Sequence, residues 1–231
     1  MKLIYFGHSS FQVLMQGKSI LIDPFLSGNE LAKDIVDVDT IEADYILLSH
    51  AHQDHSLDVE RIAKRTGAVI IGVWEIYDHY TQKGLKAHPM NIGGKWEFEF
   101  GTVKMVNAVH SSSFPDGKYG GVVGGFVVWN DDVCFYYAGD TALTLDMQLI
   151  PMTCHPLDFA ILPIGDNFTM GYDDALIASD FIQCDRIVGC HYDTFPYVKI
   201  DHEAAINAFK TENKELILLD PGKSIELSNE S

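Results

Sequence analysis

The stretch SHAHQDHS, residues 49–56, follows the apolar run DYILL directly and holds three histidines and one aspartate within six positions. A shuffled chain of this composition would rarely contain H-x-H-x-D-H, so a polar loop that is His-rich by accident is the weaker explanation. Imidazole nitrogen and carboxylate oxygen together are typical ligands of zinc, manganese and iron. The stretch therefore predicts a metal site at the end of a buried strand.

Three further ligand-type side chains share one property, because each comes where a predicted strand ends. His110 ends VKMVNAVH, Asp140 ends CFYYAGD and His191 ends RIVGCH. Loops at strand ends usually present functional side chains on a rigid scaffold. With the four from the opening stretch, the sequence offers seven candidate ligands: His50, His52, Asp54, His55, His110, Asp140 and His191.

The number of candidate ligands predicts two divalent ions rather than one. Seven ligands exceed the needs of a tetrahedral ion, whereas two ions can share one carboxylate and still leave a position for water. His50 and His52 are two residues apart, so in an extended segment they point the same way. Asp54 and His55 lie beyond them, where the chain turns toward a helix, and could bind the second ion. Zinc is the expected metal, with manganese or iron as alternatives.

The composition is that of an ordinary globular protein. The chain has 231 residues, of which 47% are hydrophobic, so we expect one domain over residues 1–231 with a substantial core. No stretch approaches the roughly 20 apolar residues of a membrane span, and the N-terminal MKLIYFGHSS lacks the features of a signal peptide. The four cysteines form no CxxC pair, which is consistent with a reduced compartment. A cytoplasmic location is therefore expected.

The formal net charge of −17 limits the classes of partner. A polynucleotide or an anionic membrane surface would be repelled at long range, and few lysines and arginines are available to contact phosphates. Bound metal would neutralise part of the negative charge near the site. The sequence thus predicts a small-molecule substrate, no nucleic acid and no membrane partner, and it is compatible with a homo-oligomer.

Hydrophobic periodicity divides the chain into two β-rich halves, each followed by helical segments. In the first half we expect strands at residues 2–15, 19–24, 44–50 and 68–73, and helices at 56–67, capped by Ser56 and ended by Gly67, and at 74–83. In the second half we expect β structure at 95–110, 120–130, 133–140, 158–165, 186–191 and, as the final strand, 216–220, with helices at 172–183 and 201–213. The pattern predicts two sheets packed face to face with helices outside.

The order of the ligand-type residues resembles a known family over essentially the whole chain. H-x-H-x-D-H, then a lone His, then an Asp after a Gly, then a late His is similar to the metallo-β-lactamase superfamily. Within it, five short motifs resemble the predicted metal-dependent hydrolases grouped with ascorbate-6-phosphate lactonase: GHSSF, LIDPF, AGDT, FTMG and HYDTFP.

The resemblance implies an α/β fold, the αββα four-layer sandwich. It places His50, His52 and His110 on one metal ion. It places Asp54, His55 and His191 on the second ion, with Asp140 bridging the two. The expected activity is hydrolysis of a small ester, lactone, amide or phosphodiester by a hydroxide that a binuclear site activates. Asp54 is the expected catalytic residue, which orients the nucleophile and can take its proton.

Three alternatives use the same fold. One is an iron oxidoreductase, but in the flavodiiron branch the second His of the hexapeptide is typically Glu, and here it is His52 with no flavin domain. A nucleic-acid-processing nuclease is disfavoured by the net charge of −17. A non-catalytic binding module would be expected to have lost ligands, whereas this chain keeps all seven.

Three residues outside the ligand set carry two interpretations each. Asp23, in ILIDP, either hydrogen-bonds a ligating histidine or starts the turn at Pro24. His8, between Gly7 and Ser9, either faces the site as a support for a ligand or a substrate contact, or is a turn histidine. Tyr192 either stabilises a developing oxyanion or anchors its loop.

Overall fold

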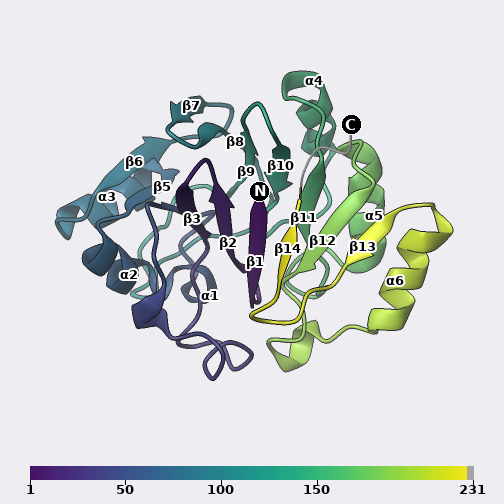
Figure 1. The fold of residues 1–231 in the computed structure, drawn as a ribbon, viewed down its shortest axis with the longest axis horizontal. Coiled ribbons are helices and arrows are strands. Elements are labelled where there is room, and N and C mark those ends of the chain that lie inside the picture. Colours follow the sequence, from purple (N-terminus) through teal and green to yellow (C-terminus); the bar gives the residue numbers. More distant parts are fainter. Residues whose placement is uncertain (228–231) are drawn as a thin grey trace.

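The computed structural model describes residues 1–227 and is built around two seven-stranded mixed sheets (Figure 1). The first sheet has the strand order β14(Ser224–Glu226), β1(Lys2–Gly7), β2(Ser10–Met15), β3(Lys18–Ile22), β4(Tyr45–Leu47), β5(Val69–Val73), β6(Ala87–Met90). The second has the order β13(Glu215–Ile217), β12(Arg186–Cys190), β11(Phe159–Pro163), β10(Cys134–Tyr137), β9(Gly124–Trp129), β8(Gly101–Asn107), β7(Lys95–Phe98).

Both sheets follow one plan, an antiparallel meander that continues into parallel strands. In the first sheet β1 to β3 are antiparallel and β3 to β6 are parallel. In the second sheet β7 to β10 are antiparallel and β10 to β13 are parallel. Parallel neighbours require crossovers, and helices provide four of them: α2(Val59–Thr66), α3(Trp74–Gln82), α5(Tyr172–Phe181) and α6(His202–Thr211).

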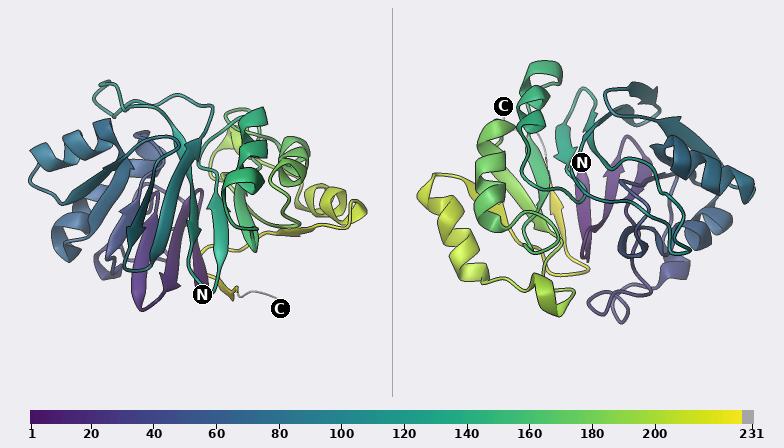
Figure 2. Two further views of the ribbon diagram at one scale, coloured as in Figure 1. Left: turned by 90° about the horizontal axis from the view of Figure 1, so that it is seen from above. Right: turned by 180° about the vertical axis from the view of Figure 1, so that it is seen from behind.

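The layers are those of an αββα sandwich. Seen from above, the two sheets stand side by side with α2 and α3 outside the first and α5 and α6 outside the second (Figure 2). Short helices complete the described chain: η1(Val38–Thr40), α1(Gln53–Ser56), η2(Leu145–Leu149), α4(Ile150–Thr153) and η3(Pro196–Val198). The predicted fold class is confirmed.

The main apolar core lies between the sheets. Phe11 and Ile46 of the first sheet and Phe126 of the second are fully buried within one cluster. A second cluster, which includes Tyr136 and Phe209, fills the space between the second sheet and its helices. Because strands of both sheets are fixed by these cores, the loops at their ends are held in place.

Two predicted boundaries in the first half are wrong. Residues 2–15 form two strands, since the chain reverses between Gly7 (φ 96°) and Ser10, with His8 also at positive φ (57°). Ser56 is not a helix cap: it lies in α1, and its hydroxyl donates to the carbonyls of Ala51 and His52. Gly67, at φ 74°, does end α2 as predicted.

The predicted final strand, 216–220, is followed by another. β13 ends at Ile217, and β14 then crosses to the first sheet and pairs antiparallel with β1. Two backbone hydrogen bonds extend this pairing, from Tyr5 N–H to the Lys223 carbonyl (3.0 Å) and from Gly222 N–H to the Tyr5 carbonyl (2.7 Å). The segment 222–227 therefore pairs with the edge of β1 that β2 does not cover.

Among the helices within residues 1–227, none has the length and the apolar character that crossing a membrane requires.

Candidate metal centre

The opening stretch leaves the first sheet at the end of β4 and turns into α1. His50 is fully buried beyond the strand, and His52 precedes the helix, where its carbonyl accepts the N–H groups of His55 and Ser56. Asp54 and His55 therefore sit within one helical turn, while His50 and His52 precede it. The local fold thus separates the four candidate ligands of the stretch into two pairs, one before α1 and one within it.

The first cluster consists of His50, His52 and His110. One ring nitrogen from each lies within 4.8 Å of the others. His50 Nε2 and His52 Nδ1 are 3.0 Å apart. His110 reaches them from the loop after β8, in the second sheet. Three imidazoles in this arrangement are a suitable donor set for zinc or another first-row divalent cation.

The second cluster consists of His8, Asp54, His55 and His191. One ligand atom from each again lies within 4.8 Å of the others. Asp54 Oδ2 is 4.0 Å from His55 Nε2 and 3.9 Å from His191 Nε2. These atoms come from α1 in the first half and from the end of β12 in the second, so the second cluster joins the two halves.

Asp140 lies between the clusters. Its Oδ1 is 3.2 Å from His55 Nε2, and its Oδ2 is 3.1 Å from His191 Nε2 and 3.6 Å from His110 Nε2. The residue follows β10 and is 2% exposed. Its carboxylate is thus within reach of both donor sets, which is the position that a shared ligand requires.

The donor set fits a cation. His55 Nε2 and Asp140 Oδ1 are buried and lie 3.2 Å apart, and within residues 1–227 neither makes a hydrogen bond of good geometry. An unpartnered buried polar atom costs about 1–3 kcal/mol. A divalent ion bound by both atoms would satisfy them.

Charge in the site is set by burial and by close partners. Burial alone would lower the pKa of His55, but the carboxylates of Asp140 and Asp23 raise it well above the usual range. Burial opposes ionisation of Asp140, yet His191 and His55 hold the pKa of that carboxyl well below its usual value. Burial lowers the pKa of His50. Ionised Asp140 and neutral His50 are therefore in the states that bind metal, whereas His55 must lose the proton on Nε2 when a cation binds there.

Asp23 lies directly behind the cluster residues. Its Oδ2 accepts hydrogen bonds from His55 Nδ1 (2.7 Å), Ser49 Oγ (2.5 Å) and Tyr137 Oη (2.6 Å), and its Oδ1 accepts one from Ser49 N–H (2.8 Å). Ser49 Oγ also lies 3.0 Å from His50 Nδ1. This geometry fixes the Nδ1–H tautomer of His55 and turns its Nε2 toward Asp140, which favours the ligand-supporting interpretation of Asp23.

The two other residues with alternative interpretations differ in position. His8 Nε2 lies 3.1 Å from Asp54 Oδ2, inside the second cluster. The Tyr192 hydroxyl donates to the Leu219 carbonyl (3.4 Å), and its ring stacks on Tyr5, so this side chain anchors its loop in the structure.

Sequence reasoning missed three side chains that hold the site together. Ser49 and Tyr137 donate to Asp23, and Thr194 Oγ1 lies 3.1 Å from His8 Nδ1. Ser49 is part of the opening stretch, and Thr194 follows His191 closely, so nearness to a candidate ligand was the one signal available. Tyr137 carries no such signal, because it reads as an ordinary strand residue.

The chain segments that follow β11 and β12 approach each other closely at Gly165, directly after β11. A Cβ on this residue would lie 1.9 Å from the carbonyl oxygen of His191. Glycine at this position therefore permits the backbone that carries His191 to pass directly beside the neighbouring strand.

Comparison with known proteins agrees with this architecture. Residues 18–192 match the family model of the β-lactamase superfamily domain. A protein of Christiangramia forsetii named UPF0173 metal-dependent hydrolase is 60% identical over 98% of this chain and 100% of its own. The solved structure of Igni18, described as a metallo hydrolase from Ignicoccus hospitalis, is 34% identical, with a TM-score of 0.87 over 97% of each chain. An isothiocyanate hydrolase from Delia radicum gut bacteria shares the fold, with a TM-score of 0.78 at 18% identity over 99% of each chain.

Proposed function

The chain belongs to the metallo-β-lactamase superfamily and is a metal-dependent hydrolase, and from that premise we propose that it cleaves a small ester, lactone, amide or phosphodiester at a site that holds two divalent ions. One observation carries the proposal. Two donor clusters lie next to each other, with the rings of His50 and His55 4.2 Å apart, and Asp140 lies within 3.1–3.6 Å of histidine nitrogens from both.

The first ion would be held by His50, His52 and His110. The second ion would be held by Asp54, His55 and His191, and Asp140 would be shared. Zinc fits the imidazole-rich donor set best, and manganese and iron fit it as well. The strongly acidic chain supports a small-molecule substrate rather than nucleic acid, and a cytoplasmic location remains our prediction.

Two bound cations would lower the pKa of a shared water and polarise the substrate oxygen. The residues of this chain then have separate tasks. Asp54 orients the attacking water through its carboxylate and accepts a proton from it. Asp140 would offer its carboxylate to both cations. Asp23 holds His55 in the tautomer whose Nε2 is free to bind.

The test combines metal content with one substitution. Elemental analysis of protein loaded with zinc or manganese should give two ions per chain, and one ion or none would contradict the binuclear site. Asp54→Asn keeps the size of the side chain but removes its charge. We expect turnover of an activated ester or phosphodiester to fall by a factor of about 10²–10⁴, with residual activity that rises with pH.

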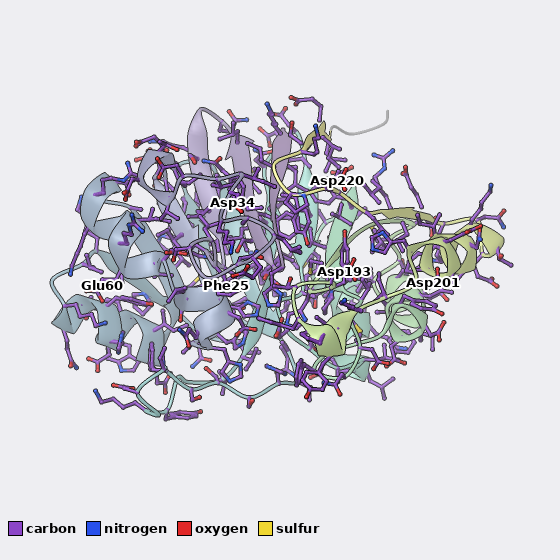
Figure 3. All side chains as sticks on the ribbon, turned by 90° about the horizontal axis from the view of Figure 1, so that it is seen from below. Phe25, Asp34, Glu60, Asp193, Asp201 and Asp220 are labelled. Atoms are coloured by element: carbon purple, nitrogen blue, oxygen red, sulfur yellow. The ribbon has the colours of Figure 1, made fainter. Side chains whose placement is uncertain are left out.

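The matched control is Asp34→Asn, an exposed carboxylate that Figure 3 shows on the first half of the molecule. It should hydrolyse and bind metal as the unchanged protein does. Wild-type activity of Asp54→Asn with both ions bound would refute the role of Asp54. If zinc- and manganese-loaded protein cleaves none of these substrates while iron-loaded protein consumes oxygen with a reductant, the enzyme is an oxidoreductase instead.

A further inference from the structure

We propose that His8, together with Thr194, is a positioning residue that holds the carboxylate of Asp54 toward the second ion. The inference rests on the proposed function, since it assigns a task within the same binuclear site. His8 is not one of the seven candidate ligands, so its task is additional to theirs.

His8 is fixed in place by its backbone and by its surroundings. It is fully buried in the turn between β1 and β2, at φ 57°. Its carbonyl accepts hydrogen bonds from His191 N–H (2.8 Å) and from the Tyr5 hydroxyl (3.2 Å). Its ring packs against the rings of Phe25 and Phe195, at centroid distances of 5.6 and 5.3 Å. The imidazole therefore has little freedom to turn away.

Both ring nitrogens of His8 face a polar partner, and the two partners together define the tautomer. Nε2 is 3.1 Å from Asp54 Oδ2, and an ionised carboxylate can only accept, so Nε2 carries the proton. Nδ1 must then accept, and Thr194 Oγ1, 3.1 Å away, can donate to it. The competing acceptor for that hydroxyl, the Tyr192 carbonyl, is farther away at 3.3 Å. The chain of donors thus runs from Thr194 through His8 to Asp54.

Asp54 depends on this support more than the other carboxylates of the site do. Its side chain is 29% exposed, whereas that of Asp140 is 3% exposed. Asp23 accepts four hydrogen bonds, but within residues 1–227 the carboxylate of Asp54 accepts one, from His8. Without that bond, rotation of the Asp54 side chain would move Oδ2 out of the second cluster.

The test exploits the two nitrogens of the ring. In His8→Gln the amide nitrogen replaces Nε2 and can donate to Asp54. In His8→Asn it replaces Nδ1, which reaches Thr194 but not Asp54. For stability the expected order is reversed: His8→Asn should be the more stable variant, because asparagine tolerates positive φ better than glutamine does. A purely structural role for His8 therefore predicts that His8→Asn is the milder change, and a positioning role predicts the opposite for metal binding.

The measurements are stepwise zinc affinities from competition with a chelator, and the visible spectrum of the cobalt-substituted protein. His8→Asn should lower the affinity for the second ion about 10–100-fold, leave the first unchanged, and alter the part of the cobalt spectrum that appears with the second ion. His8→Gln should restore most of the affinity. Thr194→Val should give an intermediate loss, because Nδ1 no longer accepts a hydrogen bond.

Equal loss of the second ion in His8→Gln and His8→Asn would overturn the inference and make His8 a direct ligand. Wild-type affinity in both variants would overturn it as well. These failures differ from failure of the proposed function, which would appear as fewer than two ions in the unchanged protein.

Discussion

Replacing Asp23 with asparagine tests how much the hydrogen bonds behind the site contribute to metal binding, because Asp23 contacts His55 but is not one of the seven candidate ligands. Asp23 is fully buried and accepts four hydrogen bonds, three from the side chains of His55, Ser49 and Tyr137 and one from the backbone N–H of Ser49. Asparagine has one carbonyl oxygen and one amide nitrogen, so it cannot accept at both positions. The best orientation keeps the oxygen where Oδ2 lies and turns the amide group toward Ser49 N–H.

The cost follows from that orientation. One hydrogen bond to a charged acceptor is lost, worth about 1.5–3 kcal/mol, and a donor then faces a donor. The three remaining bonds lose the negative charge of their acceptor. We therefore expect the free energy of unfolding of the metal-free protein to fall by about 2–4 kcal/mol. Because His55 loses its ionic partner at Nδ1, zinc affinity at the second ion should fall about 10–100-fold.

Urea denaturation in the presence of a chelator measures the free energy of unfolding, and chelator competition measures the zinc affinity at the second ion. Tyr137→Phe is the matched control, since it removes one donor to Asp23 and leaves the bond to His55 intact. It should destabilise the fold while changing zinc affinity far less. If Asp23→Asn unfolds within about 0.5 kcal/mol of the unchanged protein and binds zinc equally well, the reasoning about Asp23 is refuted.

Three further predictions concern other parts of the molecule. Hydrogen bonds from two lysines lower the pKa of Glu60 from 4.5 to about 2, so Glu60→Gln should cost up to about 1 kcal/mol at neutral pH. The stabilisation is fully present above pH 4.5 and is lost as the pH falls toward 2, so denaturation curves of the two proteins should converge there; a constant difference would contradict the assignment. Gly165→Ala should destabilise the fold by about 1–3 kcal/mol or more and weaken the second ion through His191, whereas Gly171→Ala, whose added Cβ would meet Asp166 at 3.5 Å, should not; equal melting temperatures would refute this. Gel-shift or anisotropy assays should detect no tight, salt-dependent binding of tRNA or duplex DNA, and submicromolar affinity that falls steeply with salt would reopen the nuclease alternative.

The fold and the strand-end positions of the candidate ligands could be predicted from the sequence, because both depend on local patterns. Ligand-type residues after apolar runs indicated strand ends, and the structure places His110, Asp140 and His191 after β8, β10 and β12. Gly67 marked the end of α2 for a local reason as well, since its φ of 74° suits glycine.

The supporting contacts were not accessible, because they join residues far apart in the chain. Tyr137 reaches Asp23 across 114 positions, and Thr194 reaches His8 across 186. The turn at His8 was missed for a different reason. Strand-forming residues lie on both sides of GHSS, LIYF before it and FQVLM after it, so the sequence predicts one strand through the point where the chain reverses. The positive φ of His8 cannot be predicted from the pattern of apolar residues.

The pairing of β14 with β1 ties the order of synthesis to the completion of the site. β1 is made among the first residues, yet the strand that covers its outer edge is made after residue 223. Until then the growing chain carries an open strand edge, which is a template for association with other chains. A chain truncated after residue 217 would have every candidate ligand but no β14 to pair with β1. We therefore expect such a chain to aggregate through the open edge of β1 rather than to act as a weak enzyme.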